Sequence, residues 1–592
     1  RDFRFAKLIA SSASKSIRHH RLTLEYTSNP SWYAVQALPY LMEYPHECNE
    51  QIFSRLYANS LASHIANSDP AIKRVFESWG ETPASTTLLS NLQKNEELKA
   101  VILQETPWVM DAKDETIARQ RLGLLFELNN LKAQEATALA QLQKNQSGSG
   151  AWSWFAGMPD SWWVTQYIVE GFGHLDRLGV KSVRNDNGLW TMLSKAVGYI
   201  DGQLNESYQW LKAHGLLDQD NLGYMAVHYL YARSFFPDLP IPSYAQEAVS
   251  YYWSQAEQYW LQRDFYSQGM LCLALYRKDK LQTANDIIAS LREHSLSDEE
   301  MGMWWKANSG WYWYQAPIER QAILIEAFSE VAKDTLTVNE MRTWLLKNKQ
   351  TNNWKTTKAT AQACYALLLE GTAWLGSSQL AEITVGGGKL DPSPKNGSWP
   401  EAGTGYIKTS WTGSDIKPAM GEVCVLNPNP GPSWGALYWQ YFEDLDKITP
   451  AETPLKLTKQ LFIERTTDHG LVLDPIRDNN RIKVGDKVVV RIELRVDREM
   501  EYLHMKDLRA SGFEPLNVLS RYKWQDGLGY YEATGDAATN FFIERLPKGT
   551  YVFEYGMRAF QKGDFSNGIT SIQCMYAPEF TAHSEGIRIK IE

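Results

Sequence analysis

The sequence contains few cysteines, and their arrangement would not support a covalent or metal-bound scaffold. Five occur in 592 residues, an odd number without a C-x-x-C pair. This spacing fits neither a zinc framework nor a disulfide-stabilised small domain. We therefore expect no metal and no cofactor. The five positions are Cys48, Cys272, Cys364, Cys424 and Cys574.

Long apolar runs and basic blocks are missing as well. No stretch of 18 apolar residues occurs, so we expect no membrane span in this sequence. The net charge of −9 is mild for this length, which argues against nucleic acid as a main partner. The chain opens Arg1-Asp2-Phe3 without a signal peptide. We interpret it as a piece of a longer protein whose targeting signal or anchor lies elsewhere.

The apolar content is ample for several cores. Apolar residues make up 44% of the chain, and a chain this long usually divides into two to four domains. Residues 20–26 alternate apolar and polar, as in a half-buried strand. Helical patterns follow from about residue 30 to 375, and strand and turn patterns return near 376.

The most informative stretch is residues 44–51, Y-P-H-E-C-N-E-Q. Cys48 and Gln51 stand three apart, so a thiol and a carboxamide can face each other across one tight turn. If sulfur replaces the amide nitrogen, ammonia leaves and an internal thioester forms. Residues 52–66 read as a helix, whose N-terminus would favour thiolate and developing oxyanions. The alternative is that Cys48 is a small buried apolar residue.

The flanking sequence resembles one known family. Residues 29–41 (N-P-S-W-Y-A-V-Q-A-L-P-Y-L) and 53–59 (F-S-R-L-Y-A-N) surround the motif. They resemble the thioester region of bacterial α2-macroglobulins, which are related to the vertebrate protease inhibitor and to complement components. By position, Cys48 and Gln51 correspond to the thioester pair, and Asn49 occupies the variable position of the motif.

The resemblance implies a protease inhibitor rather than a turnover enzyme. In the family, a protease cleaves a bait segment, the protein rearranges, and a lysine of the attacker takes the acyl group. Gln51 would supply the carbonyl and Cys48 would leave as thiolate. The implied partners are target proteases and the N-terminal macroglobulin domains of the parent chain. The implied location is the periplasm or cell envelope of a bacterium, with an anchor outside this chain.

Several neighbours of the motif have open roles. Tyr44 and Tyr57 are candidate shields against water or ordinary core residues. Glu50 either fixes the turn or is solvated at a helix start. Complement relatives use a histidine, but none is assigned that role here. The histidines considered are His46, His214 and His228.

Repeated helical hairpins predict how the helices assemble. A helix end, a turn with tryptophan and an apolar helix recur around Trp154, Trp313 and Trp354. Such hairpins bury their apolar faces only by stacking on one another. An α/α toroid is one closed solution, and it is the fold of the family's thioester domain. The tryptophans are expected to wedge between hairpins rather than to line a sugar cleft.

The resemblance then implies four segments. Residues 1–28 and 376–454 would be the two parts of a split CUB-like β-sandwich domain, and 29–375 the toroid inserted into it. Residues 455–592 would be a C-terminal macroglobulin-like β-sandwich, which 555–559 and 575–580 resemble. Within it, residues 487–496 alternate almost strictly, which predicts a strand with its even-numbered residues in the core.

Two other functions stay open. One is a carbohydrate-active α/α toroid enzyme with an appended β-sandwich, which needs two carboxylates about 5–10 Å apart. Asp160, Asp264 and Glu319 are candidates, although no spacing singles out a pair. The other is a structural module in which the thioester never forms.

Overall fold

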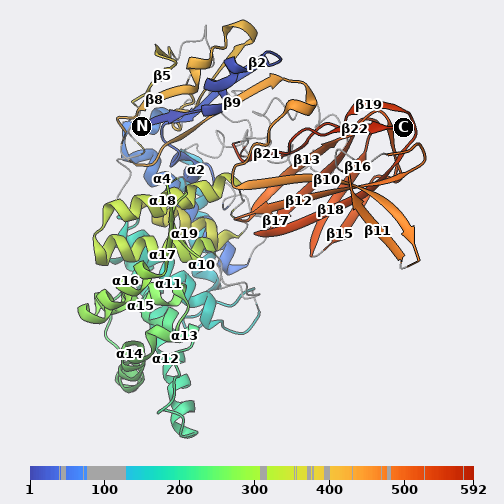
Figure 1. The fold of residues 1–592 in the computed structure, drawn as a ribbon. Coiled ribbons are helices and arrows are strands. Elements are labelled where there is room, and N and C mark those ends of the chain that lie inside the picture. Colours follow the sequence, from blue (N-terminus) through green and yellow to red (C-terminus); the bar gives the residue numbers. More distant parts are fainter. Residues whose placement is uncertain are drawn as a thin grey trace.

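The chain folds into a helical body, a β domain that contains the N-terminus, and a β-sandwich that contains the C-terminus (Figure 1). It is described from a computed structural model. The residues that the structure describes are 1–38, 41, 48–70, 72–75, 128–155, 157–299, 301–306, 317–351, 354, 356–369, 375, 379–391, 400–429, 431–468, 470–476, 482–525, 527–575, 577 and 579–592.

Six helices form a closed inner ring. Each packs against the next, and the last returns to pack against the first. Most of their residues are buried, on all faces of each helix, as expected for helices that are enclosed by others. In ring order they are α4 (Asn49–Ser68), α11 (Trp162–Arg177), α13 (Tyr224–Arg233), α15 (Phe265–Arg277), α17 (Pro317–Ala327) and α19 (Thr357–Leu368).

Outer helices cover this ring and complete an α/α toroid, the fold expected for this region. They are α10 (Leu128–Asn145) on α4, α12 (Asn187–Ala213) on α11, α14 (Gln246–Tyr259) on α13, α16 (Leu281–Glu293) on α15 and α18 (Thr335–Thr351) on α17. Only one stripe of such a helix is buried. In α16 it consists of Ala284, Ile287, Ile288 and Leu291, the spacing of an amphipathic surface helix.

Buried tryptophans join successive hairpins. The indole of Trp152 donates to the carbonyl of Leu142 at 2.9 Å, and that of Trp305 donates to the carbonyl of Leu291 at 2.8 Å. Both carbonyls lie in the last turn of an outer helix, and that of Leu142 also accepts from the backbone N–H of Gln146 at 3.0 Å. Each tryptophan therefore fills space between helices and donates to a helix end.

The repeat indicated three other tryptophans, Trp154, Trp313 and Trp354. Trp354 is buried, but Trp154 is 41% exposed, so the prediction that Trp154 is a wedge is wrong. Its ring lies on the surface of the turn that Trp152 anchors. Trp313 lies outside the described residues. A hairpin of β3 (Ser295–Asp298) and β4 (Gly302–Trp305), which the sequence patterns did not predict, carries Trp305.

The strands at the start of the chain pair with strands that follow the toroid. β1 (Asp2–Arg4) pairs with β8 (Glu422–Leu426), and β2 (Arg18–Thr27) lies between β7 (Ile407–Thr412) and β9 (Trp434–Phe442). β5 (Glu382–Val385) and β6 (Gly388–Lys389) extend the first sheet in the order β1-β8-β5-β6. The toroid is thus inserted between β2 and β5, as the fold class predicts.

The C-terminal domain consists chiefly of two antiparallel sheets. One has the order β11-β10-β12-β18-β14 and the other β15-β16-β17-β13-β20-β21, while β19 (Gly563–Ser566) pairs with β22 (Arg588–Ile591). The first sheet comprises β10 (Leu455–Thr467), β11 (Gly470–Pro475), β12 (Lys487–Val496), β14 (Phe513–Pro515) and β18 (Gly549–Ala559). The second comprises β13 (Met500–Leu508), β15 (Arg521–Gln525), β16 (Leu528–Thr534), β17 (Ala538–Leu546), β20 (Thr570–Cys574) and β21 (Thr581–His583).

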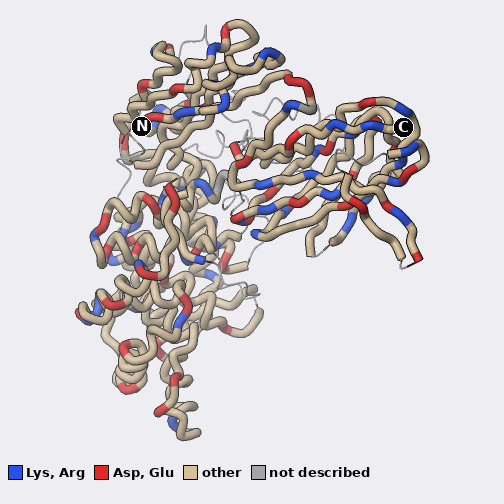
Figure 2. Tube along the Cα trace, in the orientation of Figure 1, with Lys and Arg blue, Asp and Glu red and all other residues tan. Residues whose placement is uncertain are grey.

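Acidic and basic residues are interspersed along all three bodies (Figure 2). Among the described helices, none combines the length and apolarity that a membrane span requires.

Candidate functional site

Cys48 occupies the N-cap of α4, directly before the first helical residue. Its carbonyl accepts hydrogen bonds from the backbone N–H of Gln51 at 3.0 Å and of Ile52 at 2.9 Å. The Cys-Asn-Glu-Gln tetrapeptide is therefore the opening turn of the helix, which begins three residues earlier than the sequence pattern indicated. The turn lies at one end of an inner helix, and Cys48 is buried.

The surroundings of the Cys48 sulfur favour the neutral thiol over the thiolate. Burial raises the pKa of the thiol above its ordinary value, and the charge of Glu50 acts in the same direction. The backbone N–H groups of Gln51 and Glu50 lower the pKa, as expected at a helix N-terminus, but burial outweighs them. The helix N-terminus therefore favours the thiolate, as expected, but burial of the sulfur disfavours the thiolate more strongly.

Asn49 fixes the turn to the neighbouring hairpin. Its side-chain amide donates to the carbonyl of Ser153 at 2.8 Å, and its Oδ1 accepts from the side chain of Asn145 at 2.8 Å. Its backbone N–H donates to the carbonyl of Trp154 at 3.0 Å. The position that varies in the motif thus has a definite anchoring role in this chain, which the local sequence could not indicate.

Glu50 is buried and joins α4 to α19. Its Oε1 accepts from the hydroxyl of Thr357 at 2.7 Å and of Ser54 at 3.1 Å, and its Oε2 accepts from the Cys48 sulfur at 3.9 Å. Burial raises the pKa of this carboxyl, while the two hydroxyl bonds and the charge of Lys358 lower it in part. Of the two predicted roles, solvation at the helix start is wrong, since the side chain is buried.

Gln51 shares one feature of its carboxamide with Gln166 and Gln268. Its Oε1 is buried and has no hydrogen-bond partner among the residues that the structure describes. An unpaired buried acceptor costs about 1–3 kcal/mol, and such a group calls for a specific explanation. A carbonyl that takes part in acyl chemistry is one such explanation.

Tyr44 and Tyr57 are the two residues considered as shields of the motif against water. Tyr44 lies outside the described residues. Tyr57 is fully buried on α4 with its ring centroid 6.0 Å from that of Phe53, and burial raises its pKa well above the usual range. It is located two turns into the helix from Gln51, so it belongs to the interior of the ring of helices.

A stack of aromatic rings, which was not predicted, lies beside the turn. Trp154 stacks on Trp163 with 5.1 Å between ring centroids, and Trp163 stacks on Tyr167 at 5.5 Å. The Tyr167 hydroxyl lies 3.2 Å from that of Ser54, which in turn donates to Glu50. The stack connects the exposed ring of Trp154 with the buried surroundings of Glu50. Its members come from a loop and from α11, so no local motif could indicate it.

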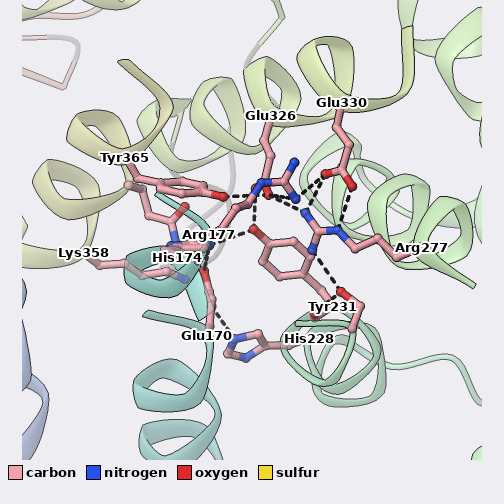
Figure 3. A network of polar contacts seen from close by, with 12 residues as sticks. Glu170, His174, Arg177, His228, Tyr231, Arg277, Glu326, Glu330, Lys358 and Tyr365 are labelled. Atoms are coloured by element: carbon pink, nitrogen blue, oxygen red, sulfur yellow. Dashed lines mark hydrogen bonds and ion pairs between the residues drawn. The ribbon is translucent and has the colours of Figure 1, made fainter. Parts of the chain in front are cut away.

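The interior of the ring of helices contains paired charges (Figure 3). Glu170 of α11 accepts from Nε2 of His228 on α13 at 2.7 Å and from the side-chain amide of Gln362 on α19. Burial alone would raise the pKa of Glu170, but the hydrogen bond from His228 and the charges of His228, His174 and Lys358 lower it to about 2. His174, one turn further along α11, stacks on Tyr365 with 3.7 Å between centroids, and burial lowers its pKa to about 4.

A second buried carboxylate links the other inner helices. Glu326 of α17 accepts from Tyr231 at 2.5 Å, from Tyr365 at 2.9 Å and from Arg277 at 2.6 Å. Together with Glu170 it connects α11, α13, α15, α17 and α19 through side chains that pair with one another (Figure 3). The centre of the toroid therefore contains polar groups that pair with one another and stabilise its closed form, although Nδ1 of His228 has no partner among the described residues.

The remaining predicted positions do not gather at a second site. His228 is paired with Glu170, His214 is exposed and stacks on Trp210, and His46 lies outside the described residues. Asp160 accepts from the hydroxyls of Ser147 and Ser149. No group of three or more potential metal-ligating side chains occurs within the described part of the chain.

The other two carboxylates considered for carbohydrate chemistry also have structural surroundings. Asp264 is the N-cap of α15 and accepts from the backbone N–H groups of Tyr266 and Ser267. Glu319 is buried in the first turn of α17, where burial raises its pKa.

A family model identifies the C-terminal sandwich. Residues 455–579 match the model of the bacterial α2-macroglobulin MG10 domain. The sandwich is therefore a macroglobulin domain of the bacterial α2-macroglobulin type. This match supports the resemblance to the C-terminal portion of bacterial α2-macroglobulins that the residues around Cys48 indicated.

Solved structures and one curated protein are also similar to this chain. Native α2-macroglobulin from Escherichia coli, spanning domain MG7 to the C-terminus, is 12% identical with a TM-score of 0.37, over 100% of this chain and 80% of that one. Trypsin-activated α2-macroglobulin from Escherichia coli is 13% identical with a TM-score of 0.45, over 97% of this chain and 34% of that one. Circularly permutated Ras protein 2 of Dictyostelium discoideum is 22% identical over 111 residues, which are 19% of this chain and 3% of that protein.

Proposed function

We propose that this chain is the thioester-bearing C-terminal part of a bacterial protease inhibitor of the α2-macroglobulin type. Cys48 and Gln51 form the internal thioester, and a lysine of the attacking protease takes the acyl group from Gln51. The reaction occurs once per molecule, so the protein is an inhibitor and not a turnover enzyme. The proposed location is the periplasm or cell envelope, with N-terminal macroglobulin domains of the parent chain as its other partners.

One observation carries this proposal. Cys48 and Gln51 occupy the opening turn of an inner toroid helix, and the Gln51 oxygen is buried without a partner among the described residues. A thioester in that turn would be shielded from water, which it must be to survive. The family match of the adjoining sandwich supports the same assignment from a separate part of the chain.

The alternatives receive less support. In a carbohydrate-active enzyme, two carboxylates would face each other across an open aromatic cleft. Asp160 instead accepts from hydroxyls of its own loop, and Asp264 accepts from backbone N–H groups in the first turn of α15. A structural module without the thioester would not require Cys48 and Gln51 to lie in the same buried turn.

The proposal is tested by covalent capture in the full-length protein. A broad-specificity protease should become linked to the wild-type protein in a complex that survives boiling in detergent. Cys48→Ala and Gln51→Ala should abolish this linkage and leave the toroid folded by circular dichroism. Cys424→Ala, which removes an exposed cysteine on β8, should capture protease as the wild type does. Equal capture by all four proteins would contradict the proposal.

A further inference from the structure

Acyl transfer at this site requires a proton to move from the attacking amine to the departing sulfur. Glu50 lies beside that sulfur. When an amine attacks the Gln51 carbonyl, a C–N bond forms, the C–S bond breaks, and the electron pair leaves with sulfur. The amine must lose a proton and the sulfur must gain one. Because burial raises the pKa of the Cys48 thiol, expelling a bare thiolate into this environment is costly.

The carboxyl of Glu50 is held in a fixed orientation. Its Oε1 is occupied by the hydroxyls of Thr357 and Ser54, at 2.7 and 3.1 Å. Its Oε2 is turned to the Cys48 sulfur at 3.9 Å, with the thiol as donor. This is the arrangement without a thioester, with the proton on sulfur and Gln51 as a free carboxamide. A carboxyl group that accepts a hydrogen bond from this thiol is placed to exchange a proton with it.

We propose that Glu50 is a catalytic residue that carries the proton between the Cys48 sulfur and the nitrogen that enters or leaves at Gln51. In transfer, its carboxylate accepts a proton from the attacking amine and gives it to the departing sulfur. The products are an amide at Gln51 and a thiol at Cys48. In formation of the thioester, the same path runs in reverse: the proton leaves the thiol and departs with ammonia. The inference rests on the proposed thioester.

The electrostatic surroundings of Glu50 suit this role. Burial raises its pKa above the ordinary value, which makes its carboxylate a better proton acceptor. The charged and titratable groups that face it are Cys48 on its own helix, Tyr167 on α11 and Lys358 on α19. Lys358 is buried, with its Nζ 5.2 Å from the ring centroid of Tyr266, and its charge limits how far the Glu50 pKa rises.

The experiment measures the rate at which methylamine consumes the thioester of the full-length protein, compared at equal free-base amine across pH. The wild-type rate should fall on the acid side as Glu50 becomes protonated. Glu50→Gln should form the thioester slowly or incompletely, and the portion formed should react at least tenfold slower without this acid-side fall. A Glu50→Gln protein that forms the thioester fully and reacts at the wild-type rate would overturn the inference.

A second variant separates chemistry from folding. Thr357→Val removes a hydrogen bond that lowers the Glu50 pKa, so the acid-side fall should move to higher pH. Thr360→Val is the matched control, because its buried hydroxyl on the same helix bonds to the carbonyl of Trp354 instead. It should keep the wild-type profile.

Each outcome of this comparison bears on the inference. If Glu50→Gln forms no thioester, the Thr357→Val profile decides, and an unshifted profile refutes the role of Glu50. A wild-type protein without a thioester would refute the proposed function instead.

Discussion

At the residue scale, Asn49 shows how much one side chain holds the reactive turn in place. It makes three hydrogen bonds to the neighbouring hairpin and is buried. Asn49→Ala keeps the backbone bond but leaves the carbonyl of Ser153 and the amide of Asn145 without their partner. Because unsatisfied buried groups are costly, the free energy of unfolding of the toroid should fall by about 1–3 kcal/mol.

The loosened turn should also shorten the lifetime of a thioester in water. Chemical denaturation and the rate of spontaneous thiol release would measure the two effects. Asn187→Ala, at the exposed start of α12, is the control and should change neither. Loss of stability without faster thiol release would show that Asn49 supports the fold alone.

For individual residues of the site, the sequence predicted only features that are local in the chain. The spacing of Cys48 and Gln51 is visible in the chain, and so is the helix that follows. The bond from Thr357 to Glu50 joins residues 307 positions apart, and the stack from Trp154 to Tyr167 depends on how α11 meets α4. Such contacts are set by tertiary packing and have no local pattern.

At the element scale, β12 tests the register of the MG10 sandwich. Its residues Val488, Val490, Ile492 and Leu494 are fully buried. Ile492→Ala should lower the free energy of unfolding by about 2–5 kcal/mol, as for other large-to-small core changes. Arg491 points to the other face, where it pairs with Glu554 at 2.5 Å and is partly exposed.

Arg491→Ala should therefore cost about 0.2–1 kcal/mol, the usual range for such surface pairs. Urea denaturation of both variants, followed by intrinsic fluorescence, would measure the difference. A larger loss for Arg491→Ala than for Ile492→Ala would show that the strand faces the core with its other side.

The inner helices predict a specific sensitivity to acid. Burial lowers the pKa of His174 from 6.5 to about 4, so the unfolded chain binds a proton that the folded toroid resists. The stability that the neutral imidazole contributes is complete above pH 6.5 and is lost as the pH falls toward 4. The loss should amount to roughly 3 kcal/mol, since each pKa unit corresponds to about 1.4 kcal/mol.

Denaturation curves collected through this pH range would measure the loss. His174→Gln lacks the titrating ring, so its stability should be lower at neutral pH and flatter between pH 6.5 and 4.5. Below 4.5 both proteins should lose stability together, because the pKa of Glu170 is lowered from 4.5 to about 2. An equally steep slope in His174→Gln would assign the acid sensitivity to other groups.

Elements with a strong period were predicted most closely. The strand of residues 487–496 matches β12 at both ends, because strict alternation fixes register and length together. The π-helical turn at Phe328–Ala332 extends α17 through the residues predicted as helix. By contrast, α15 is buried on all sides, so its sequence lacks the amphipathic pattern that identifies a surface helix.

At the scale of the whole molecule, ring closure and the reactive turn coincide. The bond between Glu50 and Thr357 crosses the contact of α4 with α19, which closes the ring of inner helices. β1 and β2, which precede the toroid, pair with strands that follow it, so both ends of the inserted segment are attached to the same β domain. The general architecture followed from pattern and resemblance, and the predicted boundaries at residues 28, 375 and 454 stay predictions.

The central claim is the thioester, and the intact mass of the untreated full-length protein tests it most directly. Closing the bond expels ammonia, so the mass should be about 17 Da below that of the sequence, and methylamine should add its own mass while releasing one thiol, as expected for an activated carbonyl. Cys48→Ala and Gln51→Ala should show neither change. A wild-type protein with the full sequence mass, a titratable Cys48 and no response to methylamine would contradict the claim.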